Sequence, residues 1–196
     1  MRCATVRAQL YQDNSFDPKS VDKIFVLPVV YLRLEKEKKL NLDKWVHKRI
    51  MRYLKQKKYN FELVTDRSIV TNITEEDISK ANPGWIGKLG PSNSRWVMLP
   101  ILQYCATKLT FGSTANAEIY AVLYDKRNTS VVWRDKAIGR MGEGGLMGMA
   151  LSSVMAEGAI SKATANLMKN FPDKFPSKKT KKTENASTEG IFGGGE

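Results

Sequence analysis

An amphipathic helix between two strand-like segments constrains the fold of this chain more than any other feature. From residue 42 to about residue 57, apolar side chains recur at the 3.6-residue spacing of a helix that buries one face. They are Leu42, Trp45, Val46, Ile50, Tyr53 and Leu54. The β-rich run VDKIFVLPVVYL precedes this helix, and the shorter run KKYNFELVTD follows it. We therefore expect a β-α-β unit, with a bulge or a strand end at Pro28.

The second half of the chain is dominated by strand patterns. WVMLPILQYCATKLT, TANAEIYAVLYD and SVVWRDKAIGRM each read as a strand, and KRNTS joins the last two as a hairpin loop. A short helix is expected to begin at Thr74 and a long loop to cover residues 82–95, whereas a glycine-rich entry leads into a last helix that ends at Pro172. The predicted order is β-α-β-α-β-β-β-α. This is an α+β fold, a mixed sheet with helices packed mainly on one face.

The predicted organisation is a single domain with two tails. Residues 1–20 are polar, are broken by Asp17-Pro18 and read as an arm or tether. Residues 21–172 carry the patterned apolar segments and form the domain. Residues 173–196 hold few large apolar side chains and are expected to be disordered.

Residue usage argues against an enzyme. The chain has one histidine, His47, and two cysteines, which leaves few acid–base, nucleophilic or zinc-binding arrangements. Cys105 lies in an apolar run and is expected in the core. We predict no catalytic residue, no metal and no cofactor. An enzyme remains a third hypothesis, conditional on a pocket that brings together distant acids such as Glu118 and Asp135.

Positive charge is concentrated on one short segment. The formal net charge is +12, and residues 43–58 contain seven Lys or Arg residues but only one acid. On a helical wheel Lys44, Lys48, Arg52 and Lys55 fall on the arc opposite the apolar face. This arc is either a solvated surface or a binding site for an anionic partner, namely lipid head groups, acidic envelope polymers or nucleic acid. No aromatic RNA-binding pattern or helix-turn-helix signal accompanies the charge.

The glycine-rich stretch also has two interpretations. GEGGLMG lacks the spacing and the lysine of a phosphate-binding loop. Small residues alternate there with larger apolar ones, which suits either a helix packed on its own sheet or a protein interface. The candidate interface residues are Gly144, Gly145, Leu146, Met147 and Met149.

The N-terminal Cys3 has three interpretations: a buried apolar residue, a redox or metal-binding thiol, or a lipid-attachment site. Four segments and the glycine-rich helix that follows them bear on this choice in combination. The segments are CATV, KIFVLPVV, LDKWVHKRIMRYLKQKKYNFELV and AEIYAVLYDKRNTSVVWRDKA. Together they resemble a group of bacterial envelope lipoproteins. The group includes the curli-secretion lipoprotein, the penicillin-binding-protein activators and the amino-terminal domain of TolB. The resemblance covers about residues 3–172 and consists mainly of hydrophobic patterns.

The resemblance implies a fold, a location and a role. Cys3 corresponds to the acylated cysteine, although Met1-Arg2 stands where a lipobox and signal peptide are expected. The implied fold is an anticodon-binding-like α/β sandwich. The implied role is non-enzymatic: the support or assembly of an envelope complex in the periplasm, anchored to the outer membrane, with envelope proteins as partners and a homo-oligomeric state. The alternative is a cytosolic nucleic-acid-binding module that uses the basic helix 42–58.

Overall fold

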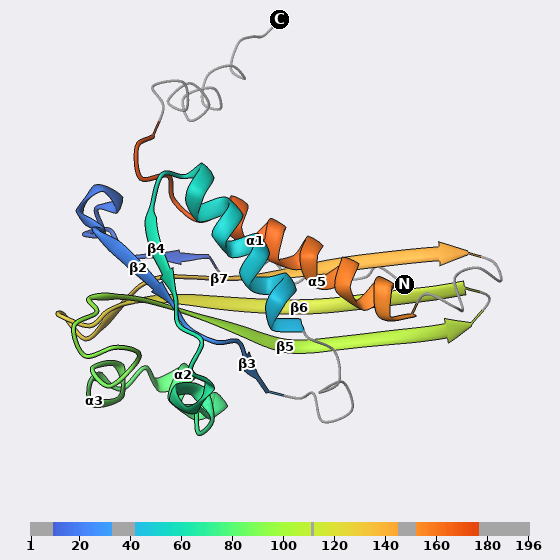
Figure 1. Cartoon of the computed structure of the whole chain (residues 1–196), viewed down its shortest axis with the longest axis horizontal. Helices are drawn as coiled ribbons and strands as arrows, with labels where there is room; N and C mark the ends of the chain where they lie inside the picture. The colour runs from blue at the N-terminus through green and yellow to red at the C-terminus, as the bar shows by residue number, and fades with distance from the viewer. Residues whose placement is uncertain (1–9, 33–41, 111, 145–151, 177–196) are drawn as a thin grey trace, which may run out of the picture.

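One mixed sheet organises the molecule (Figure 1). The computed structural model describes residues 10–32, 42–110, 112–144 and 152–176. The strand order is β1-β7-β6-β5-β2-β4, and β3 also pairs with β5. The strands are β1 (Tyr11–Gln12), β2 (Lys23–Val26), β3 (Val30–Tyr31), β4 (Asn60–Leu63), β5 (Trp96–Thr110), β6 (Gly112–Asp125) and β7 (Ser130–Gly144). The predicted α+β class is confirmed.

Two long helices lie on one face of this sheet (Figure 1). They are α1 (Leu42–Gln56) and α5 (Ser152–Lys169). The shorter α2 (Glu75–Lys80) and α3 (Pro83–Ile86), with the 3-10 turn η2 (Arg67–Val70), contribute to the core on the other face. Another 3-10 turn, η1, covers Pro18–Ser20. No helix in the described ranges has the length and apolar content needed to cross a bilayer.

The predicted β-α-β unit is present. Strand β2 pairs in parallel with β4 on one side and with β5 on the other, and α1 connects β2 and β3 to β4. The interruption expected at Pro28 is also confirmed, because β2 ends at Val26 and β3 begins at Val30. The gap coincides with Pro100 in β5. Met98 and Leu102 accept hydrogen bonds from the β2–β3 side, so alternation places the missing N–H of Pro100 on that side, between the two paired stretches.

Strands β5, β6 and β7 form a long antiparallel meander. The hairpin predicted between the last two strands is confirmed, and its loop is held by the carboxylate of Asp125, which accepts from the Arg127 N–H at 3.0 Å and from the Asn128 amide at 2.9 Å. Strand β7 continues to Gly144, so Gly142 and Gly144 lie in a strand and not in the flexible helix entry expected from the sequence. A glycine-rich strand has few side chains that could show the alternation of polar and apolar residues. Its sequence therefore looks like that of a loop.

The core has two parts, one on each face of the sheet. The larger part lies beneath α1 and α5, and it contains the fully buried Trp133, whose ring meets Phe171 edge-on at 4.8 Å. Helix α5 approaches β7 closely at Gly139, where an added Cβ would lie 2.0 Å from the backbone oxygen of Ala159. This approach is what allows α5 to cover the long hairpins.

The two tail regions reach into the described structure. Strand β1 lies within the range 1–20 assigned to the arm, and it pairs with Trp133 and Arg134 of β7 while Phe16 is buried. At the other end, the Lys174 ammonium donates to the Val21 carbonyl at 2.6 Å. Residues 1–9, which include Cys3, and residues 177–196 lie outside the described ranges.

Candidate interaction surface

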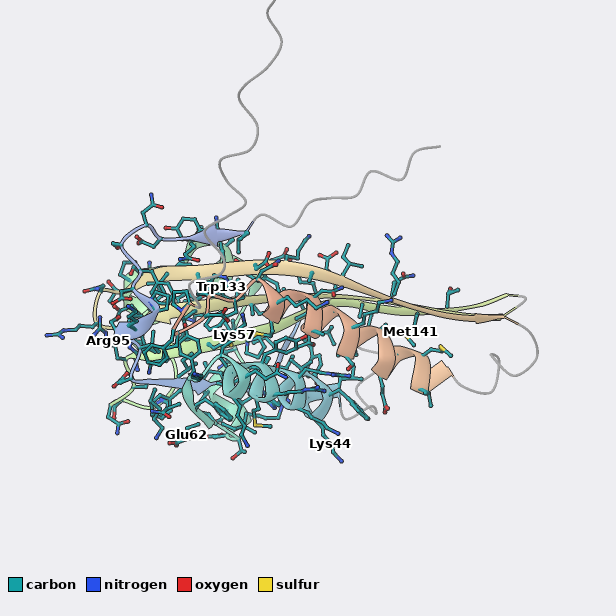
Figure 2. The ribbon with its side chains drawn as sticks, turned by 90° about the horizontal axis from the view of Figure 1, so that it is seen from above. Lys44, Lys57, Glu62, Arg95, Trp133 and Met141 are labelled. Atoms are coloured by element: carbon teal, nitrogen blue, oxygen red, sulfur yellow. The ribbon has the colours of Figure 1, made fainter. Side chains whose placement is uncertain are left out.

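The four basic residues singled out on α1 form an exposed stripe. Lys44, Lys48, Arg52 and Lys55 are all exposed, whereas Val46, Ile50 and Leu54 on the opposite side of the helix are fully buried. Figure 2 shows Lys44 on α1, pointing away from the sheet. Among the described residues, none of the four stripe cations forms an ion pair. Their charged groups are therefore exposed, and no acid in that part of the chain neutralises them.

A polar cluster holds the N-terminal end of α1. The Asp43 carboxylate accepts hydrogen bonds from the Tyr31 hydroxyl and from the Arg67 guanidinium. The same guanidinium lies 5.3 Å from the centre of the Tyr31 ring. Burial, with the hydrogen bond to Asp43 as a second cause, raises the pKa of Tyr31, which keeps the hydroxyl a donor. Asp43 also complements the helix dipole, so this cluster fixes both the helix start and the segment after β4.

His47 packs beside this cluster and is buried. Its Nε2 lies 3.0 Å from the carbonyl oxygen of Leu27. A carbonyl only accepts, so Nε2 carries the proton. Burial is the main cause that lowers the pKa of His47, which favours the neutral ring. A depression of about 280 Å³ adjoins the ring, lined by Pro28, Asp43, Lys44, His47, Leu63, Val64, Thr65 and Arg67.

Three further contacts hold the rest of α1, and the residues just after it, against α5 and the segment that follows α5. In the middle, the Arg49 guanidinium donates to the Ser161 hydroxyl. At the C-terminal end, Lys57 pairs with Asp173 at 2.8 Å, and the ring of Tyr59 packs on Phe171 at 5.3 Å. Successive residues of α1 and of the turn after it thus meet successive residues of α5 and of the segment after it. The two helices run side by side in the same direction, and α1 is held at its start, middle and end.

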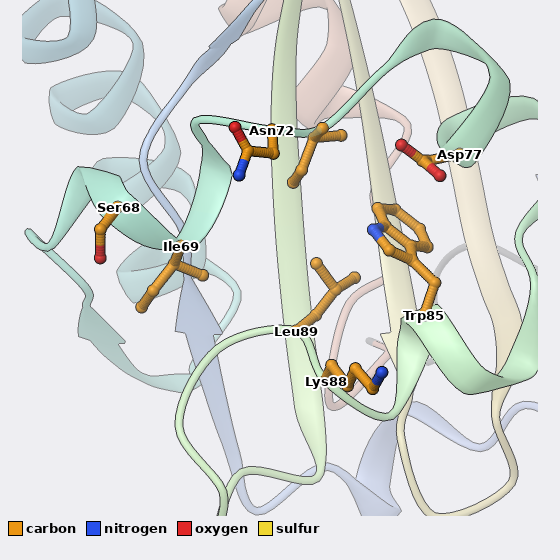
Figure 3. A pocket seen from close by; sticks show the side chains of 8 residues that line it. Ser68, Ile69, Asn72, Asp77, Trp85, Lys88 and Leu89 are labelled. Atoms are coloured by element: carbon orange, nitrogen blue, oxygen red, sulfur yellow. The ribbon is translucent and has the colours of Figure 1, made fainter.

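A second depression, of about 310 Å³, lies on the other side of the molecule (Figure 3). Trp85, Ile69, Ile73 and Leu89 supply its apolar lining, and Ser68, Asn72, Asp77 and Lys88 its polar one. Asp77 belongs to a capping box at the start of α2, where it accepts from the Thr74 N–H at 2.9 Å. The sequence pattern identified Thr74 as the start of α2 but not the depression, which is assembled from η2, α2 and the α3 region.

The remaining candidate residues are placed as follows. Gly144 pairs with Gly112 at the end of β7, while Gly145, Leu146, Met147, Met149 and Cys3 lie outside the described ranges. Cys105 is buried, as predicted.

The two acids of the third hypothesis do not meet. Glu118 pairs with Lys136 at 2.8 Å on one face of the sheet, and Asp135 accepts from the Asn170 amide at 2.8 Å on the other. Within the described ranges, no three His, Cys, Asp or Glu residues are grouped so as to hold a metal ion.

Comparisons with known proteins give only distant likenesses. No family model and no curated protein matches the chain. Among solved structures, the PelC dodecamer from Paraburkholderia phytofirmans is 14% identical, covers 82% of this chain and 96% of its own, and has a TM-score of 0.47. Lipoprotein GNA1162 from Neisseria meningitidis is 19% identical, covers 67% and 94%, and has a TM-score of 0.44. A minor lipoprotein from Acinetobacter baumannii is 6% identical, covers 76% and 91%, and scores 0.39. Bacterial lipoproteins thus occur among the loosely similar structures.

Proposed function

We propose that this chain is a non-enzymatic accessory protein of a bacterial envelope. In this proposal a lipid on Cys3 holds the protein to a membrane, with the outer membrane and the periplasm as its location. The folded domain binds or helps to assemble other envelope components, as a homo-oligomer. On the sequence patterns quoted above, the curli-secretion lipoprotein, the penicillin-binding-protein activators and TolB serve as models for such a role.

The observation that carries the proposal is the exposed basic stripe on a helix that is fixed at three points. A stripe that is only a solvated face needs no such support, whereas a contact surface benefits from a rigid backbone. Two acids at the ends of the helix are engaged elsewhere, since Asp43 binds Tyr31 and Arg67 and Asp173 binds Lys57. No acid in the described ranges pairs with the stripe, which supports a contact with a negatively charged partner.

The anchor is tested by the intact mass of the protein made from its gene. The reading frame is extended upstream, the protein is expressed with a C-terminal tag, and the membrane fraction is analysed. We expect a chain that begins at Cys3 and carries diacylglyceryl and acyl groups. The matched control is Cys3→Ser, which should be soluble and unmodified. An unmodified, soluble wild-type chain that begins at Met1 contradicts the proposal.

A further inference from the structure

The outward surface formed by α1 and α5 together is strongly cationic. On α5, Lys162 and Lys169 are exposed on the side opposite the buried Ile160, Ala163 and Leu167. These two lysines extend the α1 stripe onto the neighbouring helix. The surface, which we call the helical layer, presents six cations: Lys44, Lys48, Arg52, Lys55, Lys162 and Lys169. None of the six forms an ion pair with any residue in the described part of the chain.

The shape of the helical layer suits a flat partner. Two helices that run side by side, each about 10–12 Å across, form a surface about 20 Å wide. The 15 residues of α1 make it roughly 22 Å long. The Arg49–Ser161 and Lys57–Asp173 contacts hold the two helices in this arrangement. The layer is a broad face and not a projecting edge, which is unlike the single helix or strand pair that enters a nucleic-acid groove.

The chemistry of the helical layer points to a lipid surface. Five of the six cations are lysines, which bind phosphates as point charges without the fork geometry that arginine uses on bases. The Lys48 ammonium lies 5.5 Å from the centre of the half-buried Trp45 ring, and Val154 at the start of α5 is 53% exposed. Lysines interspersed with an indole and an aliphatic side chain are typical of surfaces that rest in the head-group region of a membrane.

We propose that the helical layer lies against an anionic phospholipid surface. This inference rests on the proposed function, because the lipid on Cys3 brings the domain to that surface. Cys3 and Leu10 lie seven positions apart, a stretch that spans at most about 25 Å when extended. This reach is about twice the width of a helix, so the tether allows the helical layer to face the bilayer that holds the anchor. The anchor sets the distance to the membrane, and the cations set the orientation.

The test measures binding of the unacylated full chain to lipid vesicles and, in parallel, to duplex DNA and single-stranded RNA. Flotation is compared between vesicles of pure phosphatidylcholine and vesicles with one third phosphatidylglycerol. The test variant is Lys44→Glu/Lys48→Glu/Arg52→Glu, and the matched control is Lys19→Glu/Lys88→Glu/Arg127→Glu. The control removes the same charge from three exposed cations outside the helical layer.

We expect binding to the anionic vesicles only. Each basic residue near such a surface contributes about fivefold, so the test variant should lose at least about a hundredfold in its partition coefficient. The control variant has the same net charge as the test variant but an intact helical layer. Its partition coefficient should therefore fall only by the general effect of the lower net charge. Raising the salt from 0.1 M to 1 M, which shortens the Debye length from about 10 Å to about 3 Å, should release the wild type.

Three results would overturn the inference: no binding to anionic vesicles, equal losses in both variants, or binding to duplex DNA or single-stranded RNA in preference to vesicles. The last result would support the nucleic-acid alternative. None of them bears on acylation, because the chain tested carries no lipid. The mass of the membrane-bound form tests the anchor separately, so a failure of either proposal can be recognised without the other.

Discussion

Replacing Gly139 with alanine tests the contact that places α5 on the sheet. An added Cβ would lie 2.0 Å from the Ala159 oxygen and 2.4 Å from the Ala163 nitrogen. Both atoms belong to the α5 backbone, so no side-chain rotation relieves the overlap. Either the helix must move away from β7, or the strand must bend. Both changes disturb the core beneath α5, which includes Trp133 and Phe171.

The expected cost is near the upper end of the range for overpacked cores, about 3 kcal/mol. For a domain of this size, that cost lowers the Tm by about 6–12 °C. The free energy of unfolding is measured by urea titration, with tryptophan fluorescence as the signal. The matched control is Gly158→Ala on α5, where the new Cβ would meet only the flexible side chain of Met141, at 3.0 Å or more. Because alanine also favours the helix, the control should stay within about 1 kcal/mol of the wild type. A Gly139→Ala protein as stable as the wild type would refute the described packing of α5 on β7.

Three further substitutions test polar contacts. Arg95→Ala removes the bidentate partner of the buried Asp125 carboxylate and should cost about 2–3 kcal/mol in urea unfolding, whereas Lys23→Ala, whose pair with Glu62 is about half exposed, should cost less than about 1 kcal/mol. Equal costs would contradict this reasoning. His47 has a lowered pKa in the folded state, so its contribution to stability is present above the unfolded pKa of about 6.5 and is lost as the pH falls through the folded value. His47→Gln keeps a donor to Leu27 and should unfold with a weaker pH dependence below neutrality; unchanged pH dependence would argue against a buried neutral ring.

The elements that the sequence predicted correctly are those with strong local signals. The period of α1 identified both its buried face and its basic face, and KRNTS identified the β6–β7 hairpin. Strand β1 has only two residues, Tyr11 and Gln12, and its partner lies more than 120 residues away, so no local pattern indicates it. Glycines 142 and 144 have no side chain that would show the strand alternation.

The contacts that hold the candidate surface in place could not be predicted from the sequence, for a different reason. Tyr31, Asp43 and Arg67 come from three separate segments and meet only when β3, α1 and η2 are assembled. Each of them alone is an ordinary polar residue at a strand or helix end. The exposure of the stripe was predictable from helical periodicity. Its fixation against α5, through Arg49 and Lys57, depends on tertiary packing that one sequence does not encode locally.

The position of β2 in the sheet has a consequence for how the chain folds. Strands β5, β6 and β7 and helix α5 are consecutive in sequence, so they can assemble through contacts between near neighbours. Strand β2 instead pairs Ile24 with Trp96, across a long stretch of chain. During synthesis β2, α1 and β4 emerge before β5 exists. Until the meander and α5 arrive, part of the apolar side of α1 lacks its partners, so the nascent chain exposes apolar surface during this interval.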